Sequence, residues 1–175
     1  MLTNGDNSLE RAAAMRREFD RAFAVPIERD ETVREKFLAT CTGGRPCAIR
    51  LSAIAGLYAG KKITPVPGGH AALRGIAGFR GALLPVYDLP RLLGVPAASD
   101  LRWLVIARTA PIALAFERFD AQLIAPPTAI LTQVARSDLA NFVRGFLRLP
   151  DFSGPILHLP SVLDAIGISQ HGTAA

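Results

Sequence analysis

The sequence is poor in the residues that carry out catalysis. It contains two cysteines and three histidines in 175 residues. None of His70, His158 and His171 stands near a serine or cysteine in a recognisable nucleophile motif, and no pair has metal-ligand spacing. Glu117 and Asp120, which could be read as paired carboxylates, are expected to be solvated charges near a strand end. We therefore expect no enzymatic activity, no cofactor and no metal site.

The two cysteines give no sign of a redox or zinc site. Cys41 and Cys47 flank a Thr-Gly-Gly-Arg-Pro segment, which places them on the facing arms of a tight hairpin. A disulfide is geometrically conceivable, but two ligands alone do not make a structural zinc site. We expect both to be buried free thiols.

Long apolar runs are also missing. No run reaches the roughly 18 residues that a membrane-spanning helix needs. The first residues include Asp6 and Glu10 and no apolar segment, which argues against a secretory signal. The expected location is the cytoplasm.

Lysine is scarce although the chain is basic. The net charge is +5, and 17 of the 20 basic residues are arginine. Such a balance suggests a nucleic-acid partner, but the arginines are scattered and only 7% of residues are aromatic, which leaves few stacking platforms. A solvated surface is the favoured interpretation, and a basic β-barrel that binds nucleic acid is the alternative.

The N-terminal part differs from the rest of the chain. Residues 1–35 are charged, and residues 7–24 are predicted to form a helix that ends before Pro26. Its apolar positions recur at helical spacing: Met15, Phe19, Ala22 and Phe23. Two interpretations remain open, a helix that packs on its own domain and a docking helix for a further partner.

From residue 36 the chain is predicted to be mostly β, and it repeats itself. A hairpin over residues 37–51 turns at Gly43-Gly44, and short apolar strands follow. A shift of about 70 residues superposes segments in order: 73–75 on 143–145, 85–90 on 155–160, and, with a shorter offset, 37–39 on 103–105. We expect a domain over residues 36–168 made of two similar β lobes, 36–100 and 101–168, each closed into a barrel that hides its strand edges. Residues 169–175 are expected to be a loose tail.

The segment 73–94 carries the clearest local motif. Gly75, Gly78 and Gly81 are predicted to form a glycine turn, with a short strand after it and Pro85 on the edge side of that strand. Asp88 is placed to cap a following helical turn, with Pro90 in that turn and Gly94 at its end.

One part of this segment is not repeated. Phe79-Arg80-Gly81 aligns with Leu149-Pro150-Asp151 in the second copy. If the fold alone required an arginine, both copies would be expected to carry it. Arg80 is therefore a functional candidate, and the alternative is a surface arginine without a partner.

Residues 75–89 closely resemble the signature of the CheW-like domain. That signature has a glycine, two variable residues, Asn-Leu-Arg-Gly and Pro-Val-Ile-Asp-Leu in this order, and here it reads Gly-Ile-Ala-Gly-Phe-Arg-Gly-Ala-Leu-Leu-Pro-Val-Tyr-Asp-Leu. The resemblance covers roughly residues 36–168. It implies a fold of two five-stranded Src-homology-3-like barrels and a non-enzymatic adaptor in chemotaxis signal transduction.

The resemblance also implies partners. CheW-like proteins couple the regulatory domain of the histidine kinase CheA to the cytoplasmic tips of methyl-accepting chemoreceptors in membrane-associated arrays. The receptor face would comprise Arg80, Phe79, Ile54 and Leu57, and the structural motif would comprise Gly75, Gly81, Pro85 and Asp88.

Two positions depart from the family pattern. Gly56 stands where the family often has an acidic residue, and Gly78 stands where it has the asparagine of Asn-Leu-Arg-Gly. Both lie near the implied receptor face. They favour a divergent member that serves an array controlling surface motility, pili or another output.

Overall fold

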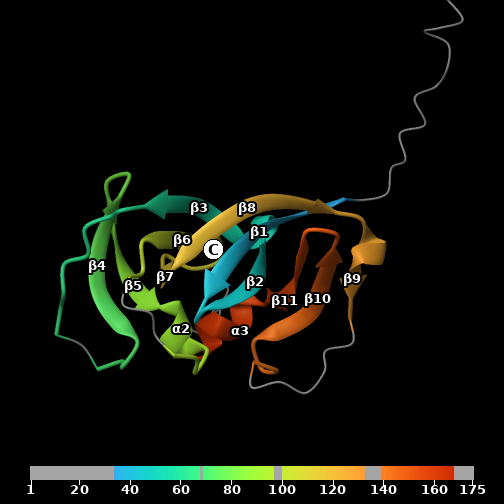
Figure 1. Ribbon diagram of the computed structural model, residues 1–175. Helices are drawn as coiled ribbons and strands as arrows, with labels where there is room; N and C mark the ends of the chain where they lie inside the picture. Colours follow the sequence, from blue (N-terminus) through green and yellow to red (C-terminus); the bar gives the residue numbers. More distant parts are fainter. Residues whose placement is uncertain (1–33, 68, 97–99, 133–138, 168–175) are drawn as a thin grey trace, which may run out of the picture. The chain divides into compact units, whose positions relative to one another are not determined.

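The computed structural model describes residues 34–67, 69–96, 100–132 and 139–167 (Figure 1). These residues belong to one unit that spans residues 33–175. The helix expected over residues 7–24 and the tail expected over residues 169–175 lie outside the described residues.

The described residues form two β-sheets and a few short helices. Sheet A has the order β8 (Arg118–Ala125), β1 (Glu35–Thr42), β2 (Arg45–Arg50), β11 (Phe152–Leu157), β10 (Val143–Leu149) and β9 (Ile130–Leu131). Sheet B has the order β3 (Ile54–Ala59), β6 (Trp103–Ala107), β7 (Ala113–Phe116), β5 (Ala82–Asp88) and β4 (Leu73–Phe79). The helices are η1 (Leu51–Ala53), α2 (Leu89–Leu92), η2 (Pro127–Ala129) and α3 (Leu159–Asp164). The mostly β prediction is confirmed.

Each sheet combines strands of one copy of the sequence repeat with a hairpin of the other copy. The β1–β2 hairpin of the first copy lies between β8 and β11 of the second copy, and the β6–β7 hairpin of the second copy lies between β3 and β5 of the first. Two parallel pairings join the copies, with Val86 opposite Ala113 and Ile156 opposite Ala48. The repeat aligns these two pairs with each other. The sheets therefore do not correspond to residues 36–100 and 101–168, because the copies exchange hairpins.

The sheets are open rather than closed barrels. Among the described residues, no ladder joins the outer strands β8 and β9 of sheet A or the outer strands β3 and β4 of sheet B. The expectation of two closed five-stranded barrels is wrong in this respect, and sheet A has a sixth strand. In sheet B the outer strands meet through side chains, since the rings of Tyr58 and Phe79 lie 5.0 Å apart in an edge arrangement.

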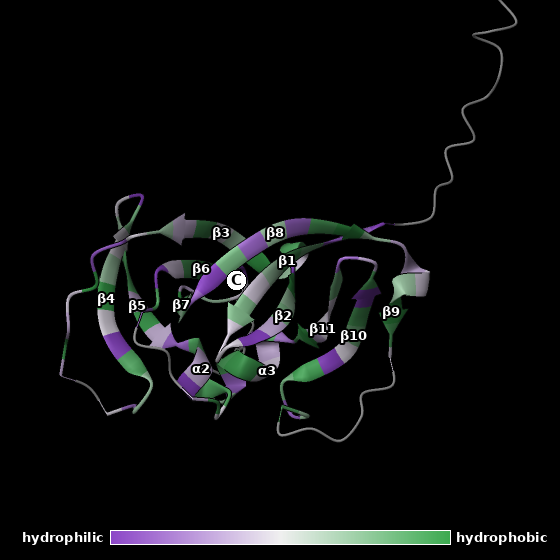
Figure 2. Cartoon of the chain, viewed as in Figure 1, coloured by the Kyte–Doolittle hydropathy of each residue, from purple (hydrophilic) through white to green (hydrophobic). Residues whose placement is uncertain are grey.

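A shared core holds the two sheets together. Buried side chains of both sheets pack with those of α2 and α3 in one cluster, which includes Leu38 and Ile49 of sheet A and Val105 and Leu114 of sheet B. The two leucines and the valine of α3 are buried, and hydrophilic and hydrophobic bands alternate along the outer strand β8 (Figure 2). This alternation is typical of a strand with one face toward solvent.

Two capped helical turns follow β5 and β11, and the turn at Asp88 is the one predicted from the sequence. The Asp88 carboxylate accepts a hydrogen bond from the backbone N–H of Arg91 at 2.9 Å, and Nδ1 of His158 accepts one from that of Ser161 at 3.3 Å. Each helix has a proline in its first turn. Gly94 follows α2 with a φ of 70°, which is the conformation expected after a helix end.

The glycine turn is shorter than the sequence suggested. Gly75 and Gly78 lie within β4, and the turn consists of Arg80 and Gly81 alone. The sequence pattern of residues 137–149 predicts a short helix or turn, and the structure has a turn at residues 139–142 only, because residues 143–149 form β10 of the second copy. Pro85 lies in a central strand rather than an edge strand, one residue before the pairing of β5 with β7 begins.

Candidate functional site

The Arg80 turn has an unusual backbone. Arg80 has a φ of 45° and Gly81 a φ of 87°, as in the type I′ turns that match the twist of a β-hairpin. A positive φ suits glycine or asparagine and costs an arginine roughly 1–2 kcal/mol. The side chain is exposed, and no hydrogen bond or ion pair to it occurs among the described residues. In the other hairpin neither Pro150 nor Asp151 has a positive φ.

Aromatic side chains support this hairpin from inside. Phe79 is only 3% exposed, and the Lys61 ammonium lies 5.5 Å from the ring centre of Tyr58 and 5.8 Å from that of Phe79. Leu83, by contrast, is 71% exposed and lies opposite Gly78, which has no side chain to cover it. The hairpin thus exposes Arg80 and Leu83 to solvent, whereas Phe79 is buried beneath them.

A groove of about 350 Å³ runs between β3 and β8, the outer strands of the two sheets. Its lining includes Leu38, Leu51, Ile54, Leu57, Phe119 and Gln122. Leu57 is half-buried, whereas Ile54 is 5% exposed and packs in the core. An apolar groove between two strands is suited to a helix or a strand of another protein.

Gly56 on β3 has no side chain, and the ring of Tyr58 occupies the space beside it. A Cβ at this position would lie 2.8 Å from the ring of Tyr58. An acidic side chain at position 56 would therefore require Tyr58 to move, which would disturb its contact with Phe79.

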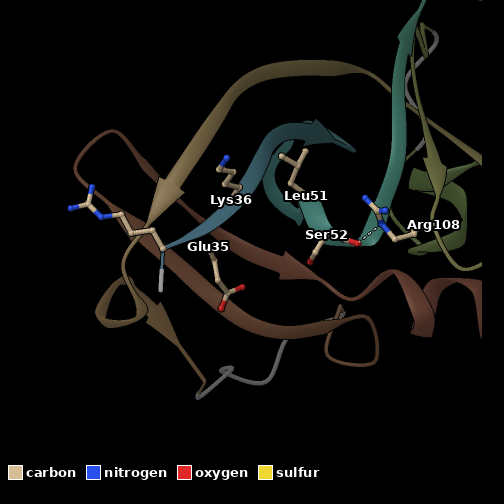
Figure 3. A pocket seen from close by; sticks show the side chains of 6 residues that line it. Glu35, Lys36, Leu51, Ser52 and Arg108 are labelled. Atoms are coloured by element: carbon tan, nitrogen blue, oxygen red, sulfur yellow. Dashed lines mark hydrogen bonds between the residues drawn. The ribbon is translucent and has the colours of Figure 1, made fainter. Parts of the chain in front are cut away.

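A second hollow, of about 440 Å³, lies next to the groove, and Figure 3 shows the residues that line it. It shares Leu51 and Arg108 with the groove and adds Arg34, Glu35 and Lys36. Glu35 is paired with Arg50, with 2.7 Å between its carboxylate and Nε.

Charged side chains fasten the hairpin turns to the corners of the chain that flank the groove. Arg108, after β6, donates from Nε to the Ser52 carbonyl and from an Nη to the Ile54 carbonyl, both at 2.8 Å. Glu117, between β7 and β8 of the same copy, accepts from the backbone N–H groups of Gly43 and Gly44 in the first copy at 2.9 and 3.0 Å. Each of these two residues therefore joins a hairpin turn of one copy to a corner of the other copy.

Reasoning from the sequence missed Arg108 and misjudged Glu117. Arg108 bonds to carbonyls more than 50 residues away, so no local spacing could reveal it. Glu117 was expected to be a solvated charge, but it holds the Gly43-Gly44 turn. Asp120 pairs with Arg118 on the surface.

The remaining chemistry is structural. Cys41 and Cys47 are both buried and unpaired, as predicted. Burial raises the pKa of Cys47 to about 12, and burial together with a hydrogen bond to Glu117 raises the pKa of Cys41. Neither thiol is therefore ionised near neutral pH. Within the described residues no group of three or more His, Cys, Asp or Glu could hold a metal ion, and no helix is long and apolar enough to cross a membrane.

The predicted receptor-face residues occupy two neighbouring features. Ile54 and Leu57 line the groove, and Phe79 and Arg80 belong to the β4–β5 hairpin. Tyr58 connects the two features, since it follows Leu57 in β3 and contacts Phe79. Because Ile54 and Phe79 are buried, Leu57 and Arg80 are the pair available for direct contact.

Comparison with known proteins identifies the family. The CheW-like domain matches residues 36–167, three quarters of the chain. Among solved structures, the chain resembles the scaffolding protein TtCheW from Thermoanaerobacter tengcongensis, with a TM-score of 0.68, 16% sequence identity, and coverage of 78% of this chain and 97% of that one. A search of curated protein sequences found no match. At 16% identity the structural likeness concerns the fold, and the domain match over residues 36–167 shows that this chain belongs to the CheW-like domain family.

Proposed function

We propose that this protein couples a CheA-type histidine kinase to chemoreceptors. Members of the CheW-like family are non-enzymatic scaffolds of chemotaxis signalling, and the observation that carries the proposal is the match over residues 36–167. The family assignment favours this function over the nucleic-acid alternative. That alternative would require oligonucleotide binding that falls steeply with added salt.

The receptor contact is assigned to the groove and the adjoining hairpin. The tip of a chemoreceptor is a helical bundle, and Leu57 with Phe119 offers apolar area for one of its helices. Arg80 stands on a turn without an internal partner among the described residues, so its guanidinium is available for a carboxylate on such a helix. The backbone strain at Arg80 supports the assignment, because strained residues tend to be kept where they contribute to function.

The kinase contact is assigned to the outer ends of the sheets, where the CheA regulatory domain, itself CheW-like, would pack. We place the protein in the cytoplasm at membrane-associated receptor arrays. The predicted helix over residues 7–24 would recruit a further partner, and Gly56 and Gly78 favour an array with an output other than ordinary swimming. We also propose that each sheet curves in the manner of a Src-homology-3 domain, as the family resemblance implies.

The test measures binding of the purified full chain to two partners from the same genome, the regulatory domain of a CheA-type kinase and the cytoplasmic fragment of a chemoreceptor. Arg80→Glu is expected to weaken receptor binding by about tenfold, as the loss of a charge-assisted contact would, and to leave kinase binding unchanged. Arg148→Glu is the matched control, because Arg148 is exposed on β10, which the repeat aligns with β4. Equal receptor binding by both variants would contradict the assigned face.

A further inference from the structure

The groove and the second hollow adjoin each other, and they differ in the charge of their lining residues. Leu51 and Arg108 belong to the lining of both. The groove is lined by Leu57 and Phe119 and has no charged lining residue besides the shared Arg108 among the described residues. The second hollow is lined by Arg34 and Lys36. A partner that fills both is therefore expected to carry charged groups at one end and apolar groups along the rest of its length.

Among the described residues, the lining of the second hollow carries a net positive charge. It has three basic residues, Arg34, Lys36 and Arg108, and one acidic residue, Glu35. The Glu35 carboxylate is already bound to Arg50, and Figure 3 shows it on the side of β1 opposite to Lys36. Arg108 uses one edge of its guanidinium for the Ser52 and Ile54 carbonyls, which holds the group in place at the junction.

The strand register gives the distance between the basic Lys36 and the apolar lining of the groove. Lys36 and Leu38 lie two residues apart on the same face of β1, opposite Ile124 and Gln122 of β8. Ile124 is 53% exposed beside Lys36. Two residues of a strand cover about 7 Å, slightly more than one turn of an α-helix. A helix in the groove would thus meet Lys36 about one turn beyond its last apolar contact.

Both walls of the groove discourage an added strand. The pairing of β3 with β6 shifts register between Ile54 and Gly56, and the pairing of β1 with β8 shifts between Ala39 and Thr40. These irregularities lie in or beside the groove, and such bulges blunt the outer edge of a sheet. A helix needs no backbone pairing with the walls and is the better occupant.

From these observations we propose that the groove binds an amphipathic helix of a partner protein with carboxylates about one turn beyond its apolar stripe. Lys36 binds the carboxylates, assisted by Arg108 and Arg34, while Leu57 and Phe119 hold the apolar stripe. The inference rests on the proposed function only in taking the groove as the docking site, and it specifies the charge pattern of the helix that docks there.

The test uses three synthetic peptides and the full-length protein. The peptides are about 18 residues long, because shorter helices are marginal in water. They are acetylated and amidated and share one leucine stripe at i, i+3, i+4 and i+7 spacing. They differ only at the positions one turn outside each end of the stripe, which are Glu, Gln or Lys. Placing the substitutions at both ends covers both binding directions, and fluorescence anisotropy measures the affinity.

The Glu peptide is expected to bind at least about threefold more tightly than the Gln peptide, and the Lys peptide more weakly still, as for partly exposed ion pairs. Lys36→Glu should reverse this order. Lys62→Glu makes the same change in net charge at an exposed loop position and should preserve the order. Leu57→Asp should weaken binding of all three peptides.

Equal binding of the three peptides would overturn the proposal, as would no binding of any. A reversal by Lys62→Glu as well as by Lys36→Glu would reduce the effect to net charge and would also overturn it. A fourth peptide, with a proline in the leucine stripe, serves as a control: if it binds as tightly as the intact peptide, the occupant is an extended strand and the proposal is overturned. The peptide measurements need neither kinase nor receptor, so their failure can be told apart from failure of the proposed function.

Discussion

Arg80 is the residue at which stability and function are expected to oppose each other. Its φ of 45° suits asparagine better than arginine, because a short polar side chain tolerates the left-handed region. Arg80→Asn is therefore expected to raise the free energy of unfolding by about 0.5–1 kcal/mol while weakening receptor binding. Chemical denaturation measures the first effect. Arg148→Asn, at an exposed strand position, provides the control, and a loss of stability in Arg80→Asn would contradict the account.

His158 is expected to make stability depend on pH. Burial, and then the charges of Arg144 and Arg50, lower its pKa in the folded state from the ordinary value of 6.5. The unfolded chain therefore binds more protons below pH 6.5, so stability falls as the pH drops from 6.5 through the folded-state pKa. Protonation also removes Nδ1 as the acceptor that caps α3, and a cap contributes about 1 kcal/mol.

The measurement for His158 is denaturant unfolding at pH 7.5 and at pH 5. His158→Asn keeps an acceptor at the cap without titrating, so the loss of stability between the two pH values should be smaller than in the wild type. Other groups titrate equally in both proteins, and the comparison isolates His158. An equal loss in both proteins would show that His158 does not contribute.

At this scale the sequence revealed some roles and hid others. Asp88 was predicted as a helix cap because a cap and its helix are neighbours in the chain. Arg80 was singled out because the repeat lacks it in the second copy. Arg108 was not found, because its two carbonyl partners become neighbours only when distant corners meet in the fold. Exposure was also hidden, since Phe79 and Ile54 are apolar residues whose burial depends on the opposite strand.

At the scale of the elements, β4 depends on a glycine at a close crossing. Gly75 has a φ of 145°, and a Cβ there would lie 2.1 Å from the carbonyl oxygen of Thr64, which bridges to Ile76. Gly145 is the corresponding residue of β10, where the Cβ would lie 3.0 Å from the Leu131 carbonyl oxygen. The same crossing thus occurs in both copies, which explains why the repeat preserves this glycine.

Gly75→Ala is expected to destabilise the protein by about 2 kcal/mol or more, because backbone must move to admit the methyl group. Gly78→Ala is the control in the same strand, since nothing lies within 4 Å of a Cβ at that position. It should change the free energy of unfolding by less than about 1 kcal/mol. Thermal unfolding of both variants checks this, and similar losses in the two would contradict the role of the crossing.

The element boundaries were the weakest part of the sequence-based prediction. Three glycines in 73–81 indicated one long turn, but Gly75 is required by a close approach and Gly78 is tolerated in a strand. The same misreading hid β10. Glycine marks a special backbone environment, and the sequence alone does not distinguish a turn from a crossing.

At the scale of the whole molecule, the exchanged hairpins make the two halves dependent on each other. A fragment of residues 101–175 lacks the β1–β2 hairpin, which lies between β8 and β11 in sheet A. A fragment of residues 34–100 lacks the β6–β7 hairpin between β3 and β5. Each fragment would leave strand edges and core surface exposed.

We therefore expect neither fragment to fold alone. Amide NMR spectra of the separate fragments should show little dispersion, and an equimolar mixture should regain dispersed signals if the halves complement each other. The chain of residues 34–175 provides the folded reference. A cooperative unfolding transition in either fragment alone would contradict the dependence.

The architecture was only partly accessible from the sequence. The repeat and the CheW-like signature over residues 75–89 indicated two similar β units and the family, which the domain match confirms. The exchange of hairpins could not be predicted, because an internal repeat shows that two copies are alike and does not show which strands pair between them. The expectation of closed barrels was wrong for the same reason, because the sequence does not show which strands pair.

The central claim is that the β3–β8 groove and the Arg80 turn form a docking surface for a chemoreceptor helix. The most direct measurement is the affinity of the purified protein for a chemoreceptor cytoplasmic fragment, compared among the wild type, Leu57→Asp, Arg80→Glu and the control Arg148→Glu. The account predicts that the first two variants lose at least about tenfold in affinity, as expected for anchors of an interface, while they bind the kinase regulatory domain normally and Arg148→Glu binds both partners like the wild type. Receptor binding that is unchanged in Leu57→Asp and Arg80→Glu would contradict it.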